Sequence, residues 1–326
     1  MKLLRYLMLF LALAVFGARA GEKSYTIAVV PKGTTHEFWK SIHAGAEKAR
    51  QELAAKGVQV EIIWKGPLRE DDRDQQIQVV ENFTSRHVSG IVLAPLDSQA
   101  MVNPVNSAVE SGIPVVVMDS GLKSDKYLSF VATDNFKGGQ LAGQFMAKLL
   151  HEKGNVILLR YAVGSNSTEE REKGFLDAIS KFPEIKVISS DQYAGPTVET
   201  AYQASQNLLN RFGNEVNGVF CVAEPATIAM TKALRDIGKA GGKVKMVGFD
   251  AGSKSVLDMK NGDVQGLAVQ NPILMGYLAV TTMVKHLQGE GVDKRIDTGV
   301  VLISPENMDQ PEMNDLLHPP LDKYLK

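Results

Sequence analysis

Short apolar runs alternate along the chain with longer segments in which apolar residues recur every three or four positions. The short runs are rich in Val and Ile and end in Gly, Pro, Asp or Ser, which is typical of buried β-strands. Within 38–56, Phe38, Ile42 and Ala46 begin a single apolar stripe, which predicts an amphipathic helix. The regular alternation of strand and helix predicts parallel sheets with right-handed crossovers.

The same alternation occurs twice, so we expect two similar α/β halves. Strands are predicted at residues 25–30, 59–64, 90–95 and 114–118 in the first half, and at 155–160, 186–190, 218–222, 245–249 and 266–270 in the second. Helices are predicted at residues 38–56, 72–85, 99–111, 169–181, 198–212, 225–237, 254–260 and 273–288. Crossings between the halves are expected at residues 125–136, 271–272 and 299–305.

The last predicted helix would return the chain to the first half, so each half combines separate segments. We expect an N-terminal lobe of residues 24–128 and 272–297 and a C-terminal lobe of residues 129–271 and 298–326. Open parallel sheets bind ligands beyond the carboxyl ends of their strands. Two such sheets facing each other would form a cleft with a hinge at its back. The cleft loops would begin at Pro31, Pro95, Asp119, Tyr161, Ser190, Ala223, Asp250 and Gln270.

The first twenty residues have the features of an export signal. Lys2 and Arg5 precede an apolar run from Leu7 to Phe16, and Ala18-Arg19-Ala20 matches the pattern that a signal peptidase cuts. The apolar run is too short to span a bilayer comfortably. We therefore expect cleavage after Ala20 and a soluble protein in a bacterial periplasm.

Composition narrows the function classes further. The 326 residues include 36 Lys and Arg against 37 Asp and Glu, and their single cysteine is Cys221. This length predicts two compact domains. A disulfide framework is excluded, because Cys221 has no partner in the chain. Nucleic-acid binding is not expected, because no positive excess is available to neutralise phosphates.

Aromatic residues follow the first predicted strand at the mouth of the expected cleft. Phe38 and Trp39 open the next helix, where Thr35 can cap its first turn. An aromatic face there suits the C–H surface of a sugar ring, whose hydroxyls meet polar groups around it. The alternative is that Phe38 and Trp39 are core residues of the helix.

Polar residues with complementary chemistry end several other strands. Asp119 and Asp250 each follow a strand, and a carboxylate there can accept two hydrogen bonds from a vicinal diol. Arg171 is a matching donor near a helix start, and Gln270 offers both a donor and an acceptor. The alternatives are that the two acids cap the following helices and that Arg171 forms a surface ion pair.

These residues belong to a series of short motifs in a specific order. The motifs are Phe38-Trp39, Val117-Met118-Asp119, Thr133-Asp134-Asn135, Gly138-Gly139, Arg171-Glu172-Lys173-Gly174-Phe175, Val247-Gly248-Phe249-Asp250 and Gln270. Over roughly residues 24–310 the series resembles the periplasmic binding proteins of sugar ABC transporters, of the ribose-binding-protein type. The resemblance implies a type I periplasmic binding protein fold, with two Rossmann-like lobes, a three-segment hinge and a pentose or hexose in the cleft.

The resemblance also implies which residues contact the sugar. Carried over by position, they are Phe38, Trp39, Asp119, Arg171, Asp250 and Gln270, with Tyr193 in a further aromatic place.

Several positions depart from the ribose pattern. Lys32 and His36 stand where small or amide side chains are usual, Ala94 and Ala223 stand where asparagines are usual, and Glu224 adds an acid. Ribose hydroxyls would lose hydrogen-bond partners in such a site. We therefore expect a sugar or sugar derivative other than ribose, with Lys32 meeting a charged or acidic substituent.

The expected function is the solute-binding component of an ABC importer. Its hinge would close on the sugar, and a membrane permease would recognise the closed lobes. We expect a monomer that needs no metal or cofactor. The main alternative is a periplasmic sensor that is read by a chemoreceptor or a two-component system.

Enzyme and regulator functions find little support in the sequence. No Gly-x-Ser-x-Gly motif occurs, and Lys40 stands where a zinc protease motif beginning at His36 requires its second histidine. A glycoside-processing role for Asp119, Glu224 and Asp250 is the lesser alternative, because sequence does not reveal their separation. A DNA-binding regulator is not expected, because the signal peptide stands where a helix-turn-helix would lie.

Overall fold

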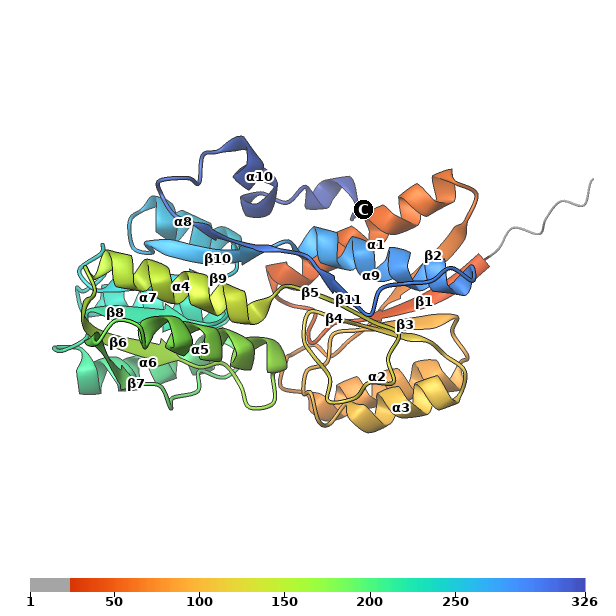
Figure 1. Ribbon diagram of the computed structural model, residues 1–326, viewed down its shortest axis with the longest axis horizontal. Coiled ribbons are helices and arrows are strands. Elements are labelled where there is room, and N and C mark those ends of the chain that lie inside the picture. Colours follow the sequence, from red (N-terminus) through yellow and green to blue (C-terminus); the bar gives the residue numbers. More distant parts are fainter. Residues whose placement is uncertain (1–23, 326) are drawn as a thin grey trace, which may run out of the picture.

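The computed structural model describes residues 24–325 and arranges them in two lobes that lie side by side (Figure 1). The expected signal peptide at residues 1–20 lies outside the described residues. Within residues 24–325, each lobe contains a six-stranded sheet with helices on both faces. The expected α/β class with two similar lobes is confirmed.

The N-terminal lobe has the strand order β11-β5-β4-β3-β1-β2, and neighbouring strands are parallel. Its strands are β1 (Ser24–Val30), β2 (Gln59–Trp64), β3 (Gly90–Leu93), β4 (Val115–Met118), β5 (Ser129–Ala132) and β11 (Arg295–Asp297). Its helices are α1 (Glu37–Ala55), α2 (Arg73–Ser85), α3 (Val102–Glu110) and α9 (Pro272–Leu287). Successive side chains of a strand point to opposite faces, so Ile27 and Val29 pack against α1 and α9, whereas Ala28 and Val30 pack against α2 and α3.

The C-terminal lobe repeats this plan with the strand order β12-β10-β9-β8-β6-β7, in which only the β10–β12 pair is antiparallel. Its strands are β6 (Lys153–Leu159), β7 (Glu184–Ser189), β8 (Gly218–Cys221), β9 (Lys245–Phe249), β10 (Gly266–Gln270) and β12 (Val300–Ile303). Its helices are α4 (Asn135–Leu149), α5 (Asn166–Ile179), α6 (Val198–Phe212), α7 (Glu224–Asp236), α8 (Ser253–Lys260) and α10 (Pro311–Leu317). Leu317 of α10 is buried in the core of this lobe, but the following 3-10 helix η1 (Leu321–Lys323) contacts α1 of the other lobe.

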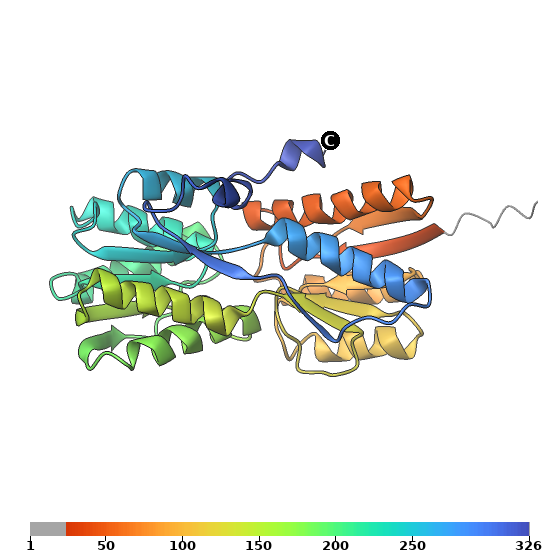
Figure 2. The same ribbon diagram turned by 45° about the horizontal axis from the view of Figure 1, so that its top comes forward.

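Three short segments of the described chain cross between the lobes (Figure 2). They lie at residues 133–134, 271 and 298–299, close to the expected positions. The Asp297 carboxylate accepts hydrogen bonds from the backbone N–H groups of Asp134, at 3.2 Å, and Gly299, at 2.9 Å. Two of the three crossings are therefore tied together at the back of the cleft.

Several elements of the fold were not expected from the sequence, among them β11, β12, α10 and η1. Residues 129–132 form β5 in the N-terminal lobe, where a crossing and the start of the C-terminal lobe are predicted, and residues 135–149 form α4, for which no helix is predicted. The strand is only four residues long, and the helix carries Gly138, Gly139 and Gly143, which weaken the apolar period.

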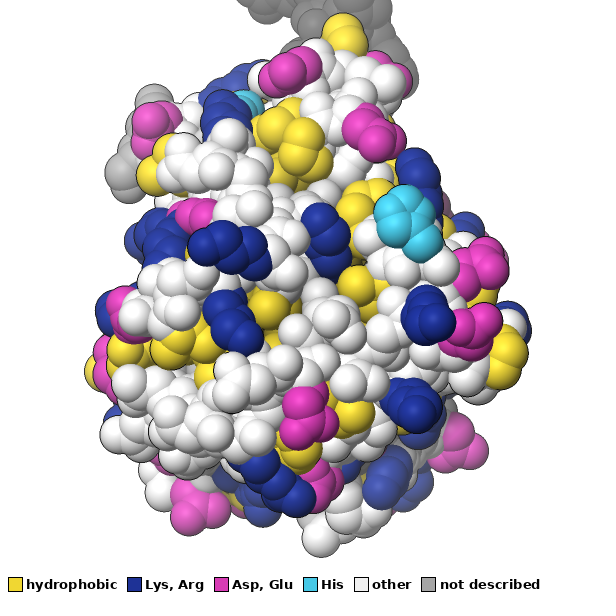
Figure 3. Space-filling model, turned by 90° about the vertical axis from the view of Figure 1, so that its left-hand side faces the viewer, with side chains coloured by type: hydrophobic (Ala, Val, Ile, Leu, Met, Phe, Trp, Pro, Cys, Tyr) yellow, Lys and Arg dark blue, Asp and Glu magenta, His cyan; other side chains and the backbone are white. Residues whose placement is uncertain are grey.

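Figure 3 shows the outer end of the C-terminal lobe, where Lys and Arg side chains are interspersed with Asp and Glu side chains. This face has no continuous basic stripe of the kind that binds nucleic acid. None of the helices described between residues 24 and 325 combines the length and the apolar character that a membrane span requires.

Each lobe contains a pair of helices that pack backbone against backbone through glycines. A Cβ atom on Gly45 of α1 would overlap the backbone of α9, and one on Gly276 of α9 would overlap the backbone of α1. Gly139 of α4 and Gly174 of α5 have the same arrangement. These contacts leave no room for a larger residue, because closely packed interiors yield little to added volume.

We expect Gly276→Ala to lower the free energy of unfolding by about 1–3 kcal/mol, because the added methyl group must push α1 and α9 apart. Urea unfolding of the full chain measures the change. Gly291→Ala is the matched control, since a Cβ atom there meets nothing within 4 Å. Equal stabilities of the two variants would contradict a need for close contact between these helices.

Candidate ligand-binding site

A cavity lies between the lobes, where the carboxyl ends of both sheets face each other. Its lining includes nine of the ten residues predicted from the sequence: Lys32, His36, Phe38, Trp39, Asp119, Arg171, Glu224, Asp250 and Gln270. Tyr193 does not line it, because its ring packs under the Arg160 guanidinium, 4.4 Å from the ring centroid. Tyr161 contributes the aromatic side chain of this lobe instead.

The two strand-end acids occupy equivalent positions in the two lobes. Asp119 follows β4 and Asp250 follows β9, and both strands are third in their sheets. Both residues have left-handed backbone conformations, with φ of 62° and 69°. Aspartate tolerates this conformation better than most residues, and such conformations gather at functional sites. Neither acid is the N-cap of a helix, since α8 begins after Gly252, so the capping alternative is wrong.

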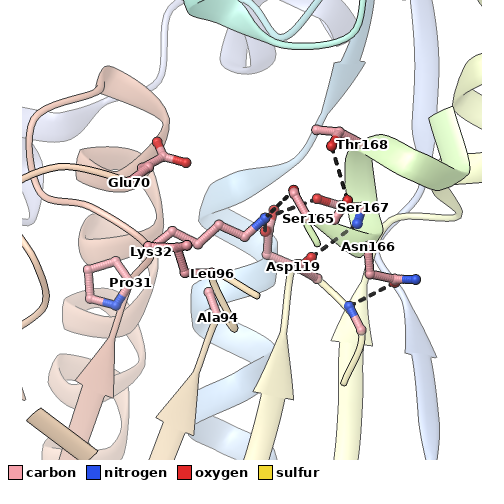
Figure 4. A network of polar contacts seen from close by, with 12 residues as sticks. Pro31, Lys32, Glu70, Ala94, Leu96, Asp119, Ser165, Asn166, Ser167 and Thr168 are labelled. Atoms are coloured by element: carbon pink, nitrogen blue, oxygen red, sulfur yellow. Dashed lines mark hydrogen bonds and ion pairs between the residues drawn. The ribbon is translucent and has the colours of Figure 1, made fainter. Parts of the chain in front are cut away.

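Lys32 reaches across the cleft from the loop after β1 (Figure 4). Its Nζ lies 3.2 Å from Asp119 Oδ2 and donates hydrogen bonds to Ser165 Oγ, at 3.2 Å, and Ser167 Oγ, at 3.1 Å. These partners use all three donors of the ammonium group. The expectation that Lys32 meets an acidic ligand therefore loses its basis, because Asp119 already balances its charge.

Glu70 is the centre of a second buried network, which was not predicted. Its Oε1 accepts a hydrogen bond from Trp39 Nε1 at 2.8 Å and lies 2.6 Å from His36 Nδ1. Its Oε2 accepts a hydrogen bond from the hydroxyl of Tyr161, in the other lobe, at 2.7 Å. Trp39 also belongs to the apolar core of the N-terminal lobe. Both interpretations of Trp39 are thus partly correct, since one side packs in the core and one edge faces the cavity.

Glu70 and His36 shift each other's pKa in opposite directions. Burial disfavours the charged form of both groups, but the hydrogen bond and the opposite charge outweigh burial. The pKa of His36 is therefore raised and that of Glu70 is lowered. His36, rather than Thr35, is the N-cap residue of α1, and its side chain makes no capping hydrogen bond.

Arg171 is buried rather than paired at the surface. Its guanidinium carbon lies 3.8 Å from the ring centroid of Phe249, and its Nε donates a hydrogen bond to Asn135 Oδ1 at 2.8 Å. Its Nη1 lies 3.8 Å from Asp250 Oδ2, and Gln270 Nε2 donates a hydrogen bond to Asp250 Oδ1 at 2.8 Å. Burial raises the pKa of Asp250 despite the nearby guanidinium.

The lobes are closed on each other. Besides the contacts of Lys32 and Tyr161, the Glu37 carboxylate accepts hydrogen bonds from the backbone N–H and the hydroxyl of Ser253, each at 2.7 Å. Ser253 begins α8, so a carboxylate of one lobe meets the positive end of a helix in the other. On the far side of the cleft, the side chain of Asn166 accepts a hydrogen bond from Gly121 N at 3.0 Å.

Five lining residues were missed by the sequence analysis: Glu70, Tyr161, Ser167, Thr168 and Pro225. The loop containing Glu70 follows β2, so the rule of strand carboxyl ends also applies to it. Glu70 nevertheless lies in the charged run Arg69–Arg73, which resembles an exposed loop. Tyr161 begins one of the predicted cleft loops, but the resemblance assigned the aromatic contact of this lobe to Tyr193.

Glu224 differs from the other acids of the cavity in having no partner for one oxygen. It is the first residue of α7, is 8% exposed, and its Oε2 has no hydrogen bond within the described chain. Burial, together with the negative charge of Asp250, raises the pKa of Glu224 from 4.5 to about 8. Among residues 24–325, no group of His, Cys, Asp and Glu side chains is suited to hold a metal ion.

Comparison with known proteins identifies the family. A family model described as a periplasmic binding protein domain matches residues 27–291. A ribose import binding protein of Haemophilus influenzae is 30% identical over 294 residues, which make up 90% of this chain and 96% of the relative. The chain therefore belongs to the periplasmic binding protein family.

Solved structures agree with this assignment. A carbohydrate transporter solute-binding protein of Agrobacterium radiobacter, in complex with D-arabinose, is 32% identical with a TM-score of 0.83, covering 90% of this chain and 99% of that chain. An ABC transporter solute-binding protein of Agrobacterium vitis, with bound D-fucose, is 34% identical with a TM-score of 0.84. The match covers 90% of this chain and 100% of that chain. The ribose-type resemblance is confirmed, and so is the expectation that the chain is not an enzyme, because these proteins bind and transport solutes.

The raised pKa of Glu224 predicts a pH-dependent stability. Between about pH 4.5 and pH 8 the folded protein keeps a proton that the unfolded chain has lost, so this group makes the free energy of unfolding fall as pH rises. Glu224→Gln removes that contribution. We expect the free energy of unfolding of the variant, taken relative to that of the wild type, to be roughly 3 kcal/mol higher at pH 7.5 than at pH 5.

Urea unfolding at both pH values measures this gain. The control is Glu215→Gln, which makes the same substitution at an exposed position of the same lobe and should leave the pH dependence unchanged. A constant difference between Glu224→Gln and the wild type at the two pH values would contradict a raised pKa at Glu224.

Proposed function

We propose that this protein is the solute-binding component of an ABC importer and that it binds a sugar or sugar derivative in the interlobe cavity for delivery to a membrane permease. The observation that carries the proposal is the convergence of hydrogen-bonding side chains from both lobes on one buried cavity. Carboxylates, a guanidinium and an amide recognise hydroxyl groups. The sugars bound by its solved relatives support the same ligand class.

Ligand binding is proposed to stabilise the closed arrangement of the lobes. Asp119 belongs to the N-terminal lobe, whereas Arg171 and Asp250 belong to the C-terminal lobe, so a ligand contacts all three only when the cleft is shut. A ligand with more contacts in the closed state shifts the population toward that state. The permease would then read the paired lobe surfaces.

As a member of this family the protein functions in the periplasm. We propose that residues 1–20 direct export and are cleaved after Ala20. We also propose that the protein acts as a monomer, without nucleic-acid partners. We propose a chemoreceptor that reads the closed form as a second partner in the same compartment.

Asp250 provides a test of the site. We expect Asp250→Asn to weaken binding of the preferred sugar by about 10- to 100-fold, because a charged hydrogen-bond acceptor is lost in a buried site. Asparagine tolerates the left-handed backbone at this position, so the fold should persist. Calorimetric titration with D-arabinose, D-fucose and D-ribose measures the affinities, and Asp309→Asn, at an exposed position, is the control. Unchanged affinity in Asp250→Asn would remove this residue from the site.

Tyr161 provides a test of closure. Tyr161→Phe removes the hydroxyl that bridges to Glu70 of the other lobe. We expect X-ray scattering to show that a bound sugar compacts the wild type, and that the variant binds the sugar about tenfold more weakly because its closed state has lost a charged hydrogen bond. Tyr193→Phe, outside the cavity, should behave as the wild type does. Scattering that does not change with any sugar would contradict hinge closure.

A further inference from the structure

The charges that line the cavity do not balance. Its carboxylates are Glu70, Asp119, Glu224 and Asp250, and its cationic side chains are Lys32 and Arg171 together with His36. Three of the acids have a cationic partner, at 2.6 Å for Glu70, 3.2 Å for Asp119 and 3.8 Å for Asp250. No such partner of Glu224 occurs in the described chain.

Two buried oxygen atoms, one of them on this unpaired acid, also lack a hydrogen-bond donor. They are Glu224 Oε2 and Gln270 Oε1, and the structure between residues 24 and 325 offers them no partner. Both side chains belong to the C-terminal lobe and are almost fully buried, with exposures of 8% and 2%. Buried acceptors of this kind are costly unless a ligand supplies donors. A ligand group that donates hydrogen bonds would satisfy these acceptors.

The surrounding space has room for such a group. Glu224 and Gln270 line the cavity and also a second chamber, which extends toward residues 316–321. This chamber leaves space beside Glu224 for a substituent of a sugar that binds in the cavity. Gly252 contributes to this chamber, and a Cβ atom there would collide with the Glu224 carboxylate.

We propose that the ligand carries a protonated amino group that pairs with Glu224, so that the substrate class of this site is amino sugars; this inference rests on the proposed function. An ammonium group donates three hydrogen bonds and carries the one positive charge that the lining lacks. A hydroxyl group supplies a donor but carries no charge, so Glu224 would keep its own proton beside a neutral sugar.

Without a ligand, Glu224 avoids this imbalance by holding a proton. The charged groups around it are Asp250, His36, Glu37 and Glu70, with Lys40 across the second chamber. The raised pKa of Glu224 reflects its burial and the negative charge of Asp250. An ammonium group takes the place of that proton, so binding should release it at pH values below 8.

Matched sugars test the proposal with the full-length mature protein. Calorimetry at pH 6.5 compares 2-amino and 6-amino hexoses and 5-amino pentoses with their parent sugars and with their N-acetyl derivatives, which keep the substituent but lose its charge. We expect at least one ammonium-bearing sugar to bind about tenfold or more tightly than its parent. Glu224→Gln should abolish this advantage, so that the amino sugar and its parent bind to the variant with equal affinity.

The wild type provides a readout that does not depend on the variant. Titrations in two buffers with different ionisation enthalpies should reveal the release of close to one proton with the amino sugar and none with its parent. Parent sugars that bind as tightly as their amino counterparts, or an amino sugar that binds without proton release, would overturn the inference and leave sugar binding intact. If none of the sugars binds, the proposed function fails together with the inference.

Discussion

A charge buried between two protein surfaces needs an opposite charge or a full set of hydrogen bonds, and this constraint decides how the lobes meet. Lys32 satisfies it with Asp119 of its own lobe and two serines of the other lobe. Glu70 satisfies it with His36 and Trp39 of its own lobe and Tyr161 of the other. Each network is complete only when the lobes are closed in this register. These polar contacts thus fix the register in which the lobes close.

The construction of each lobe restricts movement to the hinge. Parallel strands with helices on both faces form two rigid bodies, and glycine-mediated contacts at Gly45 and Gly276, and at Gly139 and Gly174, hold neighbouring helices close together. The crossings at residues 133–134, 271 and 298–299 are short by comparison. A hinge absorbs closure in a few backbone angles, so the strand-end residues keep their places within each lobe while the cavity opens.

Much of the fold and part of the site are local properties of the sequence. The strands at 59–64, 245–249 and 266–270 and the helix at 198–212 were predicted with the bounds that the structure has, because period and flanking turn residues are local signals. Asp250 and Gln270 stand at the ends of two of these strands, and Asp119 follows the strand predicted at 114–118. All three were expected in the site because the carboxyl end of a parallel strand faces the cleft. Helix α4 escaped prediction because its glycines serve the packing of α5 and dilute its apolar period.

The remaining features of the site were decided by tertiary structure. Glu70 lies in a charged run that looks exposed, but its side chain is buried among His36 and Trp39 of its own lobe and Tyr161 of the other. The sequence suggests that Lys32 is free to meet an acidic ligand, but in the structure its three donors contact Asp119, Ser165 and Ser167. By itself the sequence determined which side chains stand at the strand ends. The hydrogen bonds of Lys32 to Ser165 and Ser167, and that of Tyr161 to Glu70, depend on how the two sheets face each other, and residues 91 to 135 positions apart carry no local signal of that distance.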